Sequence, residues 1–246
     1  MDTQRRAERR PTIADIARRA GVSKGAVSYA LNDRPGVSPT TRAMIKAIAE
    51  EIGWRPNSAA RALTHARVDT VGLALCRSAR MLGVEPFFME LISGIESELA
   101  AHGCALLLQV VPDPAQELEV YRRWWGERRV DGAFLADLRQ ADPRIAAVAG
   151  LGMPAVVIGN PGEACPLPAV RSDDAGALRD TLTYLTALGH RSIARVAGLP
   201  DLVHTRLRDR AHAELCAELG LGEAVVIHTD YTGEEGAHAT RRLISG

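Results

Sequence analysis

Lys24, Ser28 and Tyr29 place three hydrogen-bonding side chains in one short stretch near the start of the chain, GVSKGAVSYALN, residues 21–32. Their spacing brings them to the outer face of a helix whose inner face carries Val27. A lysine ammonium and hydroxyl groups can hydrogen-bond to phosphates and to base edges in the major groove of B-DNA. The stretch therefore favours a helix that contacts duplex DNA, and the alternative is a solvated surface.

Three short helices are predicted to position this stretch. Thr12 can cap the first helix, which Gly21 ends, and Ser23 can cap the second. The third helix begins after Ser38, with Pro39 at its first position. A tight glycine-containing turn between the first two helices is the layout of a helix-turn-helix unit. A plain three-helix bundle is the alternative.

The charge is unevenly distributed along the chain, although its formal net charge is zero. Residues 1–67 contain 13 Lys and Arg against 6 Asp and Glu, whereas residues 68–246 contain 17 against 24. A basic head on an acidic body favours an anionic polymer as the partner of the head. With this balance the DNA interpretation leads over the plain bundle.

Length and composition limit the remaining classes. A chain of 246 residues that is 46% hydrophobic can bury one large or two ordinary cores. No run approaches the length of a bilayer span, and MDTQRRAERRPT lacks the apolar middle of a secretory signal, so we expect a cytoplasmic, nucleoid-associated protein without a membrane partner. Scattered cysteines, without the close pairing of a zinc site or a redox pair, predict buried thiols in a reducing compartment: Cys76, Cys104, Cys165 and Cys216.

No motif predicts an enzyme. The sequence has no Gly-rich phosphate loop, nucleophile elbow or HExxH motif. His190, in LGHRS, is the most tempting catalytic residue, but a histidine in a helix-to-strand turn is more often a packing or capping group. We therefore predict no catalytic residue and no cofactor.

From about residue 70 the pattern alternates between short apolar runs and amphipathic segments. Such alternation, with Gly and Pro at the boundaries, predicts an α/β fold whose parallel sheet is covered on both faces. The expected strands are residues 70–76, 105–111, 131–136, 154–159, 192–198 and 224–228. The expected helices are residues 86–101, 114–127, 143–149, 175–188, 205–219 and 234–244.

The stretch TIADIARRAGVSKGAVSYALNDRPGVSPTTRAMIKAIAEEIGWRPNSAARAL closely resembles the DNA-binding head and hinge of the lactose/galactose repressor family. Looser matches follow in FFMELISGIESELAAHG, RRVDGAFL, GMPAVVIG and ALGHRSIARVAG. The resemblance implies a small all-α helix-turn-helix domain at 1–55 and a hinge helix and linker at 56–67. It implies an α/β core like the periplasmic binding proteins at 68–246, with subdomains at about 68–165 and 166–246.

The resemblance also implies the DNA contacts. Residues 23–31 correspond to the recognition helix, with Lys24, Gly25 and Tyr29 at the positions that choose bases. Gly25 has no side chain to read with, so the operator sequence is not predicted. For the polar members of this set, the alternative is a cap or a solvated position. The supporting contacts, mostly to phosphate, are assigned to Thr12, Ser23, Ala26, Ser28 and Asn32.

The hinge PNSAARAL can form a short helix that Asn57 caps and that ends near Leu63. A helix this short is marginal alone in water because nucleation is costly. In the family, two such helices from a dimer lie side by side in the minor groove, and a leucine at the position of Leu63 wedges between base steps. Small residues such as Ala60 permit that approach. The alternative is an ordinary linker helix.

In the core, the resemblance implies an effector cleft. Phe87 and Phe88 match an aromatic position that faces the cleft, Arg208 matches an arginine that pairs with polar effector groups, and Asp173 lies near a matching acidic position whose register its neighbour Asp174 leaves open. A ring to stack on and a guanidinium for paired hydrogen bonds suit a sugar, a purine or a similar ring. The alternatives are two core phenylalanines and a surface pairing of Arg208 with Asp201 or Glu214.

The resemblance implies a transcriptional regulator that acts as a repressor, binds a palindromic operator as a homodimer and responds to a small-molecule effector, and the basic head with its outward polar helix agrees with it. The alternative is a sugar-binding protein of the periplasmic type without a DNA function. Family members continue past the position of Gly246, so we expect an incomplete second subdomain with uncovered strand edges and apolar faces.

Overall fold

The computed structural model describes residues 11–55, 67–77 and 85–245. These residues fall into two compact units, one that ends at Ala66 and one that begins at Arg67. The predicted hinge residues Asn57, Ala60 and Leu63 lie outside the described residues. Each unit is described by itself below.

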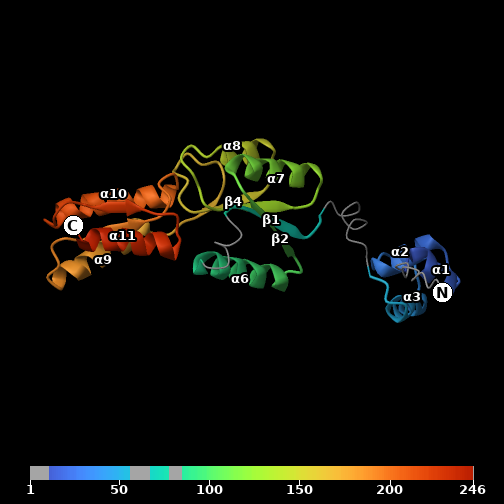
Figure 1. Cartoon of the computed structure of the whole chain (residues 1–246). Coiled ribbons are helices and arrows are strands. Elements are labelled where there is room, and N and C mark those ends of the chain that lie inside the picture. The colour runs from blue at the N-terminus through green and yellow to red at the C-terminus, as the bar shows by residue number, and fades with distance from the viewer. Residues whose placement is uncertain (1–10, 56–66, 78–84, 246) are drawn as a thin grey trace, which may run out of the picture. The chain divides into compact units, whose positions relative to one another are not determined.

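The N-terminal unit contains α1 (Ile13–Ala20), α2 (Lys24–Leu31) and α3 (Pro39–Glu51) (Figure 1). The capping that the sequence predicts at α2 and α3 is confirmed: Ser23 Oγ accepts a hydrogen bond from the backbone of Ala26 at 3.1 Å, and Ser38 Oγ accepts one from Thr41 at 3.2 Å. Gly21 ends α1 with φ at 65°, a left-handed conformation that favours glycine. The three helices enclose one core, formed by Ile16, Ala17, Val27, Ala30, Ile45 and Ala49.

The second unit begins with a five-stranded sheet in the order β2-β1-β3-β4-β5, and each neighbouring pair is parallel. Its strands are β1 (Thr70–Cys76), β2 (Ala105–Val111), β3 (Gly132–Leu135), β4 (Ala155–Ile158) and β5 (Ala169–Val170). The α/β fold with parallel sheets is therefore as predicted. The first two strands have the predicted bounds, whereas the two-residue β5 was not predicted.

Helices cover both faces of this sheet, as Figure 1 shows. The helix α6 (Pro86–Ala101) packs Phe88 against Leu73 and Leu75 of β1. The opposite face packs against α7 (Pro114–Gly126) and α8 (Pro143–Gly150). Odd and even residues of β1 thus serve two cores, because successive side chains of a strand point to opposite faces.

One glycine in β1 is needed for close packing. A Cβ atom added at Gly72 would come 2.7 Å from the ring of Trp124, which is fully buried on α7. Real Cβ contacts are longer than this, so a side chain at position 72 would push the indole out of the core. The glycine therefore lets α7 lie directly on the sheet.

The second half of this unit contains α9 (Asp174–Ala187), β6 (Arg195–Ala197), α10 (Val203–Glu218), β7 (Val226–His228) and α11 (Gly233–Ser245). The helices agree with the predicted ranges to within two residues at each end, but both strands are shorter than predicted. β6 and β7 pair in parallel with each other. Several apolar side chains of this half are exposed, among them Tyr184 at 66% and Leu188 at 60%.

Arg139 links the two halves of the second unit. Its Nη1 lies 3.3 Å from Glu117 of α7 and its Nε lies 3.5 Å from Asp201, just before α10. The backbone of Val203 also donates a hydrogen bond of 2.8 Å to the carbonyl oxygen of Leu138. These contacts fix the start of α10 against the end of β3, and that junction forms one side of the cleft described below.

Candidate DNA-contacting surface and ligand cleft

The helix α2 presents its polar face to solvent. Lys24 and Gly25 are exposed, Tyr29 is 46% exposed, and Val27 and Ala30 are buried in the three-helix core. The predicted division of α2 into an inner apolar face and an outer polar face is therefore confirmed. The outer face offers an ammonium and a phenol that are free to meet another molecule, and Ser28 lies half-buried beside them.

The Tyr29 ring rests against the loop that follows α2. A Cβ atom at Gly36 would lie 3.5 Å from Tyr29 Cδ2, and Gly36 itself has φ at 106°. The loop backbone therefore supports one side of the ring while the other side stays open. This support reduces the rotamer freedom that Tyr29 would lose on binding.

Arg42 of α3 holds the C-terminal end of α2. Its guanidinium donates hydrogen bonds to the carbonyl oxygens of Ala30 at 3.2 Å and Arg34 at 2.6 Å, and it pairs with Asp33 at 3.1 Å. Ala30 lies in the last turn of α2 and Arg34 in the loop that follows, so the guanidinium ties the end of the helix to that loop. Sequence reasoning missed this role, because a contact between α2 and the start of α3 leaves no periodic signal.

Asp33 completes the same clamp. Lys46 lies 2.8 Å from its carboxylate, and the hydrogen bond from Lys46 lowers the pKa of Asp33. Burial acts to raise this pKa, but the charge of Lys46 and the hydrogen bond and charge of Arg42 help to keep it low. Asp33 adopts φ at 51°, a left-handed conformation that ends the helix. Two side chains of α3 thus fix the turn that leads out of α2.

The other predicted DNA contacts of this unit have local partners. Thr12 donates from its backbone and its hydroxyl to Asp15 Oδ2 at 2.9 and 2.6 Å, so it caps α1. Asn32 Nδ2 donates to the carbonyl oxygen of Ser28 at 2.8 Å. Ser23 caps α2, and Ala26 contributes its backbone to that cap. These bonds use part of the hydrogen-bonding capacity of each residue. They hold α1 and α2 in place whether or not the same residues also contact DNA.

The second unit contains a cavity of about 390 Å³ between its two halves. Its walls come from the carboxyl ends of strands and from helices that follow them, which is where open α/β sheets bind ligands. Fifteen described residues line it: Arg77, Glu85, Phe87, Leu91, Ala136, Asp137, Ile158, Gly159, Val170, Arg171, Ser172, Asp174, His204, Arg208 and Tyr231. We call this cavity the cleft.

The cleft contains two of the four predicted effector residues. Phe87 and Arg208 line it, and Phe87 is 55% exposed. Phe88 is 1% exposed and belongs to the core between α6 and β1, because adjacent residues on a helix point about 100° apart. The placement of Phe88 in the cleft was therefore wrong, and the core alternative holds for it.

The acidic position of the cleft is Asp174 rather than Asp173. Asp173 caps α9, accepting a hydrogen bond of 2.9 Å from the backbone of Gly176, and it does not line the cavity. Asp174 pairs with Arg208 at 2.6 Å. The suggested surface partners of Arg208, Asp201 and Glu214, form no recorded contact with it among the described residues.

A second ion pair lies deeper in the cleft. Arg77 Nε lies 2.7 Å from Asp137, and both side chains are less than 10% exposed. The Arg77 guanidinium also packs over the ring of Tyr231 at 4.7 Å. Burial acts to lower the pKa of Arg77, but the charge and hydrogen bond of Asp137 outweigh it and raise the pKa. Arg77 therefore stays charged and remains paired with Asp137.

His204 and Tyr231 form the polar wall on the other half of the cleft. The His204 Nε2 and the Tyr231 hydroxyl are 2.8 Å apart. Burial lowers the pKa of His204, so the imidazole is neutral at pH 7. Sequence reasoning missed this pair, because the two residues lie 27 positions apart and neither is part of a recognisable motif.

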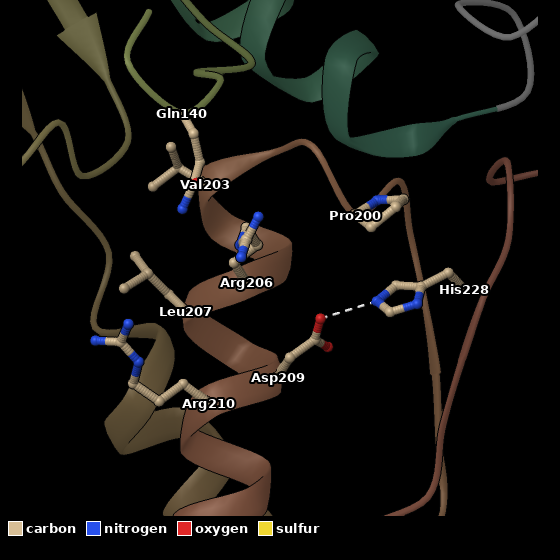
Figure 2. A pocket seen from close by; sticks show the side chains of 8 residues that line it. All are labelled: Gln140, Pro200, Val203, Arg206, Leu207, Asp209, Arg210 and His228. Atoms are coloured by element: carbon tan, nitrogen blue, oxygen red, sulfur yellow. Dashed lines mark hydrogen bonds and ion pairs between the residues drawn. The ribbon is translucent and has the colours of Figure 1, made fainter.

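Another hollow, of about 430 Å³, lies along a different face of α10. Figure 2 shows Asp209 turned toward His228, with Arg206 before it and Arg210 after it on the same helix. The Asp209 carboxylate and His228 Nε2 are 2.9 Å apart. The described residues that line it include no Phe, Tyr or Trp. A ligand ring would find no aromatic surface there, so the cleft is the better candidate for a ring-bearing ligand.

Other classes of site find no support in the part of the chain that the structure describes. No helix there is long and apolar enough to cross a membrane. No group of His, Cys, Asp and Glu in the described ranges could hold a metal ion. The four cysteines are free thiols, but Cys216 is buried whereas Cys76, Cys104 and Cys165 are half-buried, so the prediction of buried thiols was wrong for three of them.

Comparisons with known proteins agree with this geometry. Residues 12–57 match the model for bacterial regulatory proteins of the lacI family. Residues 70–239 match the model for periplasmic binding proteins and the sugar binding domain of the LacI family. The two matches cover the N-terminal unit and most of the second unit, respectively.

The chain is 34% identical over 242 residues to the HTH-type transcriptional regulator CelR of Thermobifida fusca, covering 96% of this chain and 70% of that one. Among solved structures, a complex of CelR with cellobiose has a TM-score of 0.63 at 30% identity, covering 96% and 71% of the two chains. The Lac repressor dimer bound to operator and an anti-inducer has a TM-score of 0.83 at 22% identity, covering 96% and 71%, and shares the fold. The chain therefore belongs to the LacI family of bacterial regulatory proteins, as a helix-turn-helix transcriptional regulator with a sugar-binding domain of the periplasmic-binding-protein type.

Proposed function

We propose that this regulator represses transcription by binding a palindromic operator as a homodimer, and that a sugar or related metabolite in the cleft controls its affinity for DNA. The observation that carries the proposal is the outward face of α2. Lys24 and Tyr29 project from a helix that is fixed at both ends, by Ser23 at its start and by Arg42 at its end. A rigid helix with exposed donors suits the major groove.

The proposed roles follow from the placement of each residue. Lys24 and Tyr29 contact base edges, and the backbone of Gly25 lets α2 approach the groove closely. The hydroxyl of Ser28 and the remaining donors of α2 and its flanks contact phosphates, which fixes the register without reading sequence. Asn57, Ala60 and Leu63 belong to the proposed minor-groove contact. The proposed place of action is the nucleoid.

Effector and dimer are proposed from two facts about relatives. CelR has been solved with cellobiose, and the Lac repressor has been solved as a dimer on its operator. In the present chain the cleft offers an aromatic ring, Phe87, beside paired charges, which suits a ring that carries hydroxyl groups. A dimer would place two copies of α2 at a half-site spacing of about one helical turn or a multiple of it.

The direct test is binding-site selection from random duplex DNA with the 246-residue protein. We expect a palindrome, and an affinity for it that falls steeply as salt rises, because phosphate contacts release counterions. Adding saccharides to the selected complex should then change the affinity. Enrichment of no sequence above background, at low salt and with a correctly folded protein, would contradict the proposal and favour a sugar-binding protein without a DNA function.

A further inference from the structure

The carboxyl group of Glu85 stands out among the polar groups of the cleft. Glu85 precedes α6, lines the cavity, and forms no recorded hydrogen bond or ion pair with any described residue. Its Oε2 atom is buried without a hydrogen-bond partner. A buried carboxyl oxygen without a donor is costly, so its presence on a ligand-sized cavity points to a donor that arrives with the ligand.

The three arginines of the cleft lining already have partners. Arg77 is paired with Asp137 at 2.7 Å, and Arg208 is paired with Asp174 at 2.6 Å. The Arg171 side chain, which is exposed, donates to the carbonyl oxygen of Gly162 at 3.1 Å. Burial raises the pKa of the Glu85 carboxyl and the nearby charge of Arg77 acts to lower it, yet no described residue donates a hydrogen bond to Glu85 Oε2. Glu85 is thus the acidic cleft residue whose carboxyl keeps an unused acceptor for a ligand.

From this arrangement we infer that Glu85 binds hydroxyl groups of the effector and that the effector is an uncharged saccharide rather than a phosphorylated one. Hydroxyl groups donate to a carboxylate and also accept from a carboxylic acid, so they satisfy Glu85 in either protonation state. A phosphate dianion offers acceptors only and would be repelled by the carboxylate. Phe87 and Leu91, on the same helix, supply the apolar surface on which a sugar ring can lie.

This inference rests on the proposed function, since it takes the cleft to be the effector site, but it makes a separate claim about charge. Arg208 is 44% exposed and could donate to a phosphate while it stays paired with Asp174. The carboxyl of Glu85 opposes that outcome, because a phosphorylated ligand would bring another anionic group into the cavity that Glu85 lines. A neutral saccharide brings no such charge, and its hydroxyl groups can donate to Glu85 Oε2.

The test is calorimetric titration of the whole chain with two matched pairs: cellobiose against its 6′-phosphate, and glucose against glucose 6-phosphate. The variants are Glu85→Gln, which removes the charge and keeps one acceptor, and Glu85→Leu, which removes both oxygens. Glu90→Gln is the control, because Glu90 lies in the first turns of α6, the helix that Glu85 precedes, is exposed and does not line the cleft. Each variant is first checked for an unchanged thermal melt.

We expect the wild type to bind a neutral sugar at least 10-fold more tightly than its phosphate ester. Glu85→Leu should lose about 10-fold or more in affinity for the neutral sugar. Glu85→Gln should reduce the ratio of the affinity for the neutral sugar to the affinity for its phosphate ester. Glu90→Gln should leave that ratio unchanged. A change in that preference separates a ligand contact from a general loss of stability.

Three results would overturn the inference: tighter binding of a sugar phosphate by the wild type, an unchanged preference in Glu85→Gln, or no binding of any of the four ligands. Operator binding without ligand is measured in parallel on the DNA obtained by selection. Loss of operator binding with intact sugar binding would refute the regulator proposal and leave Glu85 in its assigned role. Intact operator binding without sugar binding would leave the DNA-binding role in place and refute the role assigned to Glu85.

Discussion

The guanidinium of Arg208 and the carboxylate of Asp174 form an ion pair on the wall of the cleft, with Nη2 and Oδ1 2.6 Å apart. The pair joins α10 to the start of α9, and Asp174 is the more buried partner, with 14% of its side chain exposed against 44% for Arg208. The arginine can therefore donate to a ligand while it remains bonded to the carboxylate. This pairing fixes the guanidinium at the cavity before any ligand binds.

We predict that Arg208→Met weakens saccharide binding by about 10-fold or more, because it removes a charged donor from the cavity and leaves Asp174 without its partner. Affinity for DNA without ligand should change little. The measurement is calorimetric titration beside operator binding. Arg206→Met is the matched control, since Arg206 leaves α10 on another face and lines the second hollow. Loss of saccharide binding in Arg206→Met alone would place the ligand in that hollow instead.

The clamp on the end of α2 gives a second prediction. Arg42→Met should lower the free energy of unfolding of the N-terminal unit by about 1–3 kcal/mol, because the hydrogen bonds to the carbonyl oxygens of residues 30 and 34 and the ion pair with Asp33 are lost. It should also weaken specific DNA binding, since the end of α2 is no longer fixed. Urea denaturation and anisotropy titration measure the two effects.

Arg19→Met serves as the control for Arg42. Arg19 pairs with Glu51 at the surface, with both side chains more than half exposed, and such pairs contribute about 0–1 kcal/mol. Equal stability of the Arg42→Met and wild-type proteins would contradict the role of Arg42 as a clamp.

Acid should destabilise the second unit. Burial lowers the pKa of both His204 and His212 in the folded chain, so the unfolded chain binds more protons as the pH falls through the ordinary histidine pKa of about 6.5. Folding stability therefore declines below that pH and is unaffected by these groups well above it. Thermal melts between pH 8 and pH 5 measure the slope.

The variant His204→Asn should reduce this slope, because it removes one of the two imidazoles whose pKa burial lowers. His212 would still contribute, because its imidazole is 1% exposed and bonds the carbonyl oxygen of Ile193 at 3.2 Å. An identical pH slope in wild type and His204→Asn would show that His204 is not held neutral by its surroundings.

The proposed hinge contact predicts that one substitution can reduce bending of the operator DNA without abolishing nonspecific DNA binding. Leu63→Ala should weaken operator binding and reduce DNA bending, because the proposed wedge between base steps is lost. Binding to unrelated duplexes should persist, since it depends on phosphate contacts. Energy transfer between dyes at the ends of the operator reports the bend. An unchanged bend would reject the wedge, and the linker-helix alternative would stand.

Much of this architecture could be predicted from local pattern. The apolar runs at 70–76 and 105–111 gave the bounds of β1 and β2, and Pro86 marked the start of α6. β5 was not predicted because a strand of two residues is too short for its side chains to alternate recognisably between apolar and polar. β6 and β7 came out shorter than their apolar runs, because strand length depends on backbone pairing as well as on hydrophobicity.

The cleft was predicted only in part, for a geometric reason. Phe87 and Phe88 are neighbours in sequence, yet one lines the cavity and the other is core, and Asp173 and Asp174 divide in the same way between a helix cap and an ion pair. When the register of a family match can shift by one residue, the match does not tell which of two adjacent residues lines the cavity. Glu85, His204 and Tyr231 are brought to one cavity only by the tertiary fold. Their spacing in the sequence therefore does not predict that they line the same site.

The account depends most on the outer face of α2. The decisive measurement is fluorescence anisotropy of the selected palindromic duplex with the wild-type chain and with Lys24→Ala and Tyr29→Ala, with Arg179→Ala on the surface of α9 as the control. We predict that each α2 variant loses about 1–3 kcal/mol of binding free energy for the palindrome and that the control loses none. Wild-type affinity in both α2 variants would contradict the central claim that this helix contacts the operator.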